Sequence, residues 1–142
     1  RGKHFMCGEV GYMAFLDDYI ANTKNAGWLE SKINLNALQE KFGLDPEGDN
    51  DPQDKKSAVE YIAISIALCI NNMVMCYDCD HISIGGEIMD FFGDELFRAI
   101  VNKVRQLTVS DVQIHKKSCK EPGVLGAAGV VQQRAIKEIL TE

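Results

Sequence analysis

The sequence predicts a mixed α/β fold in which helices alternate with short strands. Residues 57–75 and residues 92–107 carry apolar side chains at helical spacing. Residues 81–84 are rich in β-branched residues, and residues 109–116 alternate apolar and polar side chains, as strands do. Since helices and strands in this order are typical of α/β proteins, we expect that class.

The N-terminal third is predicted to contain one helix between two loops. Residues 1–13 are rich in glycine and are expected to form a strand end and a loop. Residues 28–42 repeat apolar side chains at nearly helical spacing, and Gly43 is a typical helix stop. Residues 45–56 follow as an acidic segment that lacks the EF-hand spacing, so we expect a solvated surface loop.

The next helix is predicted to be the most buried element. Ser57 and Glu60 form a capping-box pattern at its start. Residues 62–75 are apolar on nearly every side, which favours burial over a half-exposed position. A last helix opens at Pro122, and we expect it to face inward with Ala127, Ala128, Val131, Ala135, Ile136 and Ile139.

Composition limits the class of protein and its partners. The 142 residues are 46% hydrophobic, which is enough for one domain with a core, spanning 1–142. The net charge is −6 and Lys and Arg are not clustered, so we expect no direct contact with nucleic acid. No run approaches the roughly 20 apolar residues of a membrane span. We therefore expect a cytoplasmic protein with no membrane contact.

Cysteines and histidines give no site of their own in the sequence. Five cysteines, an odd number without framework spacing, favour reduced thiols. Cys76 and Cys79 form a Cys-x-x-Cys pair, but no second ligand pair follows, so we interpret them as ordinary thiols. His4 and His115 have no partner readable in the sequence, so we interpret them as ordinary surface or half-buried residues. His81 lies on a predicted strand, where a packed, hydrogen-bonded imidazole explains it equally well.

Two glutamates are candidates for ligand contacts. Glu9 lies close between glycines, and a carboxylate there can accept hydrogen bonds from two adjacent sugar hydroxyls, although a surface acid in a turn fits equally. Glu30 lies near a helix start, where its charge is favoured in any case. Gly85 and Gly86 end a strand, where glycines permit close approach of a nucleotide or serve as a plain strand exit.

Three motifs, taken in order, resemble those of the ROK (repressor, ORF, kinase) family of bacterial sugar kinases and sugar-responsive repressors. They are Gly-Glu-Val-Gly-Tyr-Met at 8–13, Gly-Trp-Leu-Glu at 27–30, and Ile-Gly-Gly-Glu-Ile at 84–88. The resemblance implies that Glu9 and Glu30 contact sugar hydroxyls. It also places the Gly-Gly turn beside a nucleotide in the kinases.

The zinc ligands of that family are not matched here. Tyr12 stands where the family has a histidine, and Ala21, Thr23 and Trp28 stand where it has cysteines. Structural zinc needs four thiolate or imidazole ligands, so we expect no zinc at these positions. We expect Tyr12 and Trp28 to fill the volume by packing, and the Tyr12 hydroxyl could still reach a sugar.

The resemblance implies a fold and a choice of functions. The fold would be the C-terminal lobe of an actin-like, ribonuclease H-like ATPase, without its first strands, whose unpaired sheet edge favours a homo-oligomer. The catalytic Asp would lie in another lobe, so this chain alone is not expected to be an enzyme. We expect the sugar-sensing lobe of a repressor. The alternatives are the C-terminal lobe of a zinc-free sugar kinase that uses ATP and magnesium, and a non-catalytic subunit.

Overall fold

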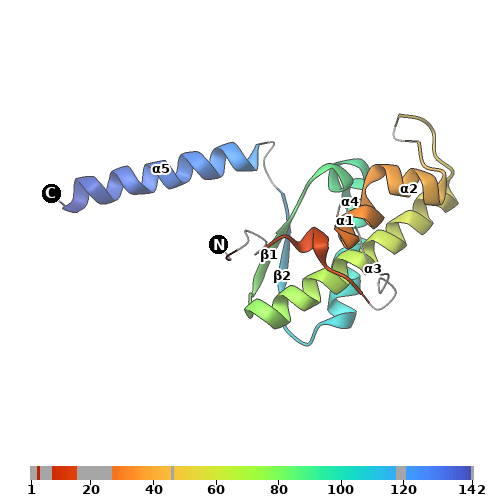
Figure 1. Ribbon diagram of the computed structural model, residues 1–142, viewed down its shortest axis with the longest axis horizontal. Helices are drawn as coiled ribbons and strands as arrows, with labels where there is room; N and C mark the ends of the chain where they lie inside the picture. Colours follow the sequence, from red (N-terminus) through yellow and green to blue (C-terminus); the bar gives the residue numbers. More distant parts are fainter. Residues whose placement is uncertain (1–2, 4–7, 16–26, 46, 118–120, 142) are drawn as a thin grey trace.

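The computed structural model describes residues 3, 8–15, 27–45, 47–117 and 121–141, and these form a mixed α/β fold that is mostly helical (Figure 1). Its elements are, in chain order, η1 (Val10–Tyr12), α1 (Trp28–Ile33), α2 (Leu35–Phe42), α3 (Pro52–Tyr77), β1 (His81–Ile84), α4 (Glu87–Leu107), β2 (Gln113–Lys116) and α5 (Pro122–Thr141). The predicted order of helices and strands in the second half of the chain is confirmed.

Strands β1 and β2 form a parallel pair joined by helix α4, as a parallel connection requires. Ile82 pairs with Ile114 in the register, and Ser83 pairs with His115. One face of the pair packs inward, because Ile82 is buried and Ile114 is half-buried. The side chains that alternate with them are exposed, as is usual for a strand with one solvated face.

The core lies between α3 and α4, which pack against each other along much of their length. Its fully buried large side chains include Ile62 on α3 and Leu96, Ile100 and Val104 on α4. An ion pair between Lys103 and Glu60 joins the two helices at the surface. The expected burial of α3 is confirmed on one side only, since Ile64 is 43% exposed and Met75 is 52% exposed.

Helix α3 begins at Pro52, five residues before the predicted start at Ser57, so the acidic loop is shorter than predicted. The Asp51 carboxylate accepts hydrogen bonds from the backbone N–H groups of Gln53 and Asp54, at 2.7 and 3.4 Å. Asp at the N-cap followed by Pro at the first helical position is a strong start signal. Ser57 instead lies inside the helix, where its hydroxyl donates to the Gln53 carbonyl at 2.9 Å.

Helix α3 is also long and apolar enough, by length and composition, to cross a membrane. The prediction that no stretch approaches such a length is therefore wrong for α3. In the structure 44% of its most apolar stretch is buried inside the molecule. Helices at the centre of a protein core share this composition.

Helix α5 extends away from the other elements (Figure 1). The helix itself was predicted, but the expectation that it faces inward is wrong. Val131 is 68% exposed, Ile136 48% and Ile139 73%. The sequence shows that this helix has an apolar side, whereas the tertiary structure leaves that side exposed.

Candidate functional site

The site is built where η1 meets the start of α1. Gly27 precedes α1 and is buried, and a Cβ placed on it would lie 2.1 Å from the Gly11 carbonyl oxygen. Such a distance is far below any van der Waals contact, so the two backbones touch only because position 27 has no side chain. A Cβ on Gly11 would lie 3.3 Å from both Cβ and Oε2 of Glu30. The first two motifs are therefore packed directly on each other.

An open cavity of about 570 Å³ lies at this junction. It is lined by residues 8–11, by Leu29, Glu30, Ile33 and Asn34, by Ile66, and by residues 84–89. All three motifs contribute to its wall, although they are far apart in the sequence. The structure thus brings together Glu9, Glu30, Gly85 and Gly86, four of the five residues predicted for the site.

The cavity wall carries negative charge and apolar surface. Glu9, Glu30 and Glu87 all line it and all are exposed. Among the described residues, no Lys, Arg or His lines this cavity. Its apolar part includes the buried Leu29 and Met89. A wall of this kind can accept hydrogen bonds from hydroxyl or ammonium groups and pack against C–H surface, but its described residues include no cationic side chain to neutralise a phosphate.

The polar group of Asn34 is already used by the fold. Its side-chain nitrogen donates to the Glu30 carbonyl at 2.9 Å, and its side-chain oxygen accepts from the Ala37 N–H at 2.9 Å. Asn34 therefore caps α2 and links it to α1. It holds the helix that carries Glu30 in place, which positions that carboxylate at the cavity.

Gly85 and Gly86 have structural reasons to be glycine apart from any ligand. A Cβ on Gly85 would lie 2.7 Å from Cβ of Lys117, the residue that follows β2. Gly86 precedes α4 with φ of 114°, a conformation that side chains disfavour. Both residues line the cavity, and the interpretation as a plain strand exit accounts for their identity.

Tyr12 does not line the cavity and is 47% exposed. The expectation that it fills the volume of a missing zinc site by packing is therefore wrong, whereas Trp28 is half-buried. Ala21 and Thr23 lie outside the described residues. In the part of the chain that the structure describes, no group of three or more His, Cys, Asp or Glu is arranged to hold a metal ion.

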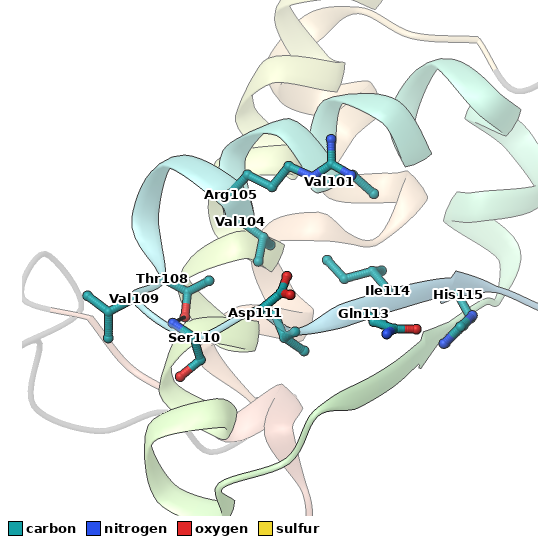
Figure 2. Close-up of a pocket in the computed structure, with 11 residues that line it drawn as sticks. Val101, Val104, Arg105, Thr108, Val109, Ser110, Asp111, Gln113, Ile114 and His115 are labelled. Carbon is teal, nitrogen blue, oxygen red and sulfur yellow. Dashed lines mark hydrogen bonds between the residues drawn. The ribbon is translucent and has the colours of Figure 1, made fainter.

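A second cavity, of about 480 Å³, lies between the end of α4 and β2 (Figure 2). Its wall includes Arg105, Asp111, Gln113 and His115 and none of the residues predicted for the site. Beside it, His81 Nδ1 and His115 Nε2 are 3.1 Å apart. The sequence gives no signal for this pair, because only the parallel register of the two strands brings the histidines together.

The described cysteines are free thiols and form no site. Cys69 is buried, Cys76 is exposed and Cys79 is half-buried. Burial raises the pKa of the Cys69 thiol, because the charged thiolate loses its solvation. Cys7 and Cys119 lie outside the described residues.

Comparisons with protein-family models, with curated proteins and with solved structures find no match.

Proposed function

We propose that this chain is the sugar-sensing effector lobe of a ROK-type transcriptional repressor, the C-terminal lobe of an actin-like, ribonuclease H-like ATPase fold. One observation carries the proposal. Glu9 and Glu30 line the same cavity together with the Gly85–Gly86 turn, although they belong to two separate motifs, at 8–13 and 27–30. Two carboxylates on one cavity wall can accept hydrogen bonds from neighbouring sugar hydroxyls, which supports the proposal.

The chemistry of the wall suits an uncharged or cationic sugar. Each carboxylate can accept hydrogen bonds from neighbouring hydroxyls, and the charge strengthens these bonds. Leu29, Ile33 and Ile66 offer apolar surface for the C–H face of a sugar ring. Because Glu87 adds a third negative charge, a phosphorylated ligand is disfavoured at this wall.

Sensing requires that the ligand bind one arrangement of the protein better than another. The cavity wall combines the η1–α1 junction with the β1–α4 turn, which belong to different parts of the chain. A sugar that contacts both Glu30 and the Gly86 turn would hold these parts together. In a repressor, the closure of the cavity wall around the sugar would alter the position of a DNA-binding domain elsewhere. This chain itself is proposed to make no contact with nucleic acid.

The alternative is the C-terminal lobe of a zinc-free sugar kinase. It is favoured by the Gly85–Gly86 turn, which lines the same cavity as the glutamates and precedes the N-terminus of α4. The catalytic Asp would come from another lobe, with ATP and magnesium as co-substrate and cofactor. The carboxylate of Glu87 beside that turn argues against a polyphosphate there.

We also propose a cytoplasmic homo-oligomer with no membrane contact. Within the described residues the sheet has only two strands, so each of them has an unpaired edge. Such edges are available for pairing with another chain. The exposed apolar side of α5, with Val131 and Ile139, adds a second surface that association could cover.

A thermal-shift screen with hexoses, amino sugars and their phosphates, each with and without Mg-ATP, tests the proposal. Stabilisation by an unphosphorylated sugar without Mg-ATP is expected, because a ligand that binds the native state raises the melting temperature. Glu30→Gln should remove most of this shift. Glu40→Gln, which changes an exposed acid on α2 outside the cavity, should leave it unchanged.

Two results would contradict the proposal. An equal shift in the wild type and in Glu30→Gln would place the ligand elsewhere. A shift that needs Mg-ATP in every case would favour the kinase alternative.

A further inference from the structure

We propose that His81 and His115 form a two-ligand site for a divalent transition-metal ion on the outer face of the β1–β2 pair. The site is separate from the proposed sugar cavity, whose wall includes neither histidine. It is also separate from the positions at which the ROK family holds zinc. The inference therefore does not depend on the proposed function.

The two rings present nitrogen atoms to each other. His81 Nδ1 lies 3.1 Å from His115 Nε2. The ring planes differ by 21° and the ring centroids are 5.4 Å apart, so the rings meet edge to edge rather than face to face. Each ring therefore directs a nitrogen, rather than its flat face, at the other.

The distance between the two nitrogens suits chelation of one metal ion. Imidazole nitrogens bind zinc at about 2.0–2.1 Å, so two of them are about 2.9 Å apart at a right angle and about 3.3 Å apart at a tetrahedral angle. The observed 3.1 Å lies between these values. To bind one ion, the two rings must turn so that their lone pairs converge on it instead of pointing at each other.

Without metal, the contact is a hydrogen bond between two imidazoles. One ring must then donate its N–H and the other must accept, since a neutral imidazole carries a single N–H. A metal ion would take the place of that shared proton. Binding requires each ring to hold its proton on the nitrogen that points away from the pair.

The strand register fixes the pair and leaves it open to solvent. His81 lies opposite Gln113 and His115 lies opposite Ser83, so the two histidines are diagonal neighbours on one face. Both histidines are exposed, while Ile82 between them in the sheet points to the core. Figure 2 shows His115 on β2 beside Gln113, at the second cavity. Water can reach the ion and complete its coordination.

Two imidazoles define the class of ion. Imidazole suits copper, nickel and zinc, and affinity for a given nitrogen site rises to a maximum at Cu²⁺. No third protein ligand is arranged beside the pair in the described part of the chain. We therefore expect an exchangeable site that prefers Cu²⁺ over Ni²⁺ and Zn²⁺ and that loses its ion on dialysis against a chelator.

To test the proposal, the untagged, full chain is titrated with CuCl₂. Calorimetry measures the stoichiometry and affinity, and electron paramagnetic resonance identifies the nitrogen ligands. One Cu²⁺ per chain with coupling to two nitrogen nuclei is expected. His81→Gln and His115→Gln should each weaken binding by about tenfold or more, since even the loss of an outer-shell partner has an effect of this size. His4→Gln is the matched control and should bind like the wild type.

A second measurement needs no variant. Cu²⁺ is paramagnetic and should broaden the amide resonances of residues 81–83 and 113–115 before those of other residues in the wild-type protein.

Equal Cu²⁺ affinity in the wild type and in the double variant His81→Gln/His115→Gln would overturn the proposal. Broadening centred elsewhere in the chain would overturn it as well.

Discussion

Gly27 lies against the backbone of Gly11 so closely that a Cβ on Gly27 would be 2.1 Å from the Gly11 carbonyl oxygen and 2.6 Å from the Tyr12 nitrogen. This contact joins η1 to α1 and thereby brings Glu9 and Glu30 to one cavity. Gly27 has φ of −58°, which any residue can adopt. The requirement for glycine is therefore steric and comes from the contact alone.

Replacing Gly27 by alanine should separate η1 from α1. The added methyl group has no room, because its neighbours are backbone atoms rather than a flexible side chain. Overpacking of this kind destabilises by about 1–3 kcal/mol. Urea denaturation should show a lower midpoint, and the stabilisation by sugar should be lost. Gly126→Ala is the control: its Cβ would meet nothing within 4 Å, so the midpoint should not fall.

Asp51→Ala tests the observed start of α3. Loss of the hydrogen bonds to the N–H groups of Gln53 and Asp54 should lower the free energy of unfolding by about 0.5–2 kcal/mol. Asp49→Ala removes the same charge from an exposed position in the preceding loop and should have a smaller effect. If Ser57→Ala proved more destabilising than Asp51→Ala, the helix would begin near Ser57 instead.

The thiols of Cys69 and Cys76 should differ in reactivity. Cys76 is exposed, whereas Cys69 is buried and its raised pKa keeps it protonated. Since the thiolate is the reactive form, iodoacetamide at pH 8 should modify Cys76 quickly and Cys69 only after unfolding. Peptide mapping by mass spectrometry separates the two sites. Equal rates in the native protein would contradict the burial of Cys69.

The ion pair between Asp94 on α4 and Lys116 on β2 should make a pH-dependent contribution to stability. Their charged atoms are 2.6 Å apart, and the hydrogen bond from Lys116 lowers the pKa of the Asp94 carboxyl below its ordinary 3.8. A lowered pKa means that the stabilisation is present above the ordinary value and is lost as the pH falls through the folded-state value.

Asp94→Asn therefore should lower stability slightly at pH 7, as measured by urea denaturation, and the difference from the wild type should shrink as the pH falls below the ordinary carboxyl pKa of 3.8. The effect should also shrink in 1 M NaCl, because the carboxylate is exposed and salt screens the pair. A difference that grows as the pH falls would have the wrong sign for this ion pair.

Local patterns were enough to predict several elements. Apolar spacing predicted α4 and the main part of α3, and the β-branched run before two glycines predicted β1. These features depend on contacts between residues close in the chain, so the sequence contains them directly. The sequence also contains a signal for the start of α3, since Asp51 followed by Pro52 is a typical helix start. The prediction assigned these residues to the loop because the segment around them is acidic.

The site was predicted only in part. Glu9, Glu30, Gly85 and Gly86 were nominated from short motifs, and the structure places all four on one cavity wall. Tyr12 was nominated from the same motif, but it does not line that cavity; it ends the short 3-10 helix η1 and is 47% exposed. A motif specifies which residues are close in sequence and does not specify the direction of each side chain.

By itself, the sequence determined the order of helices and strands in the second half of the chain, which stretches are apolar, and that the chain has no cluster of basic residues. Only the tertiary structure decided which distant residues meet. The packing of Gly11 on Gly27 and the register that places His81 beside His115 both depend on backbone approach between segments far apart in the chain. The exposure of the apolar side of α5 was decided in the same way, since spacing shows that a helix has an apolar side but not what lies against it.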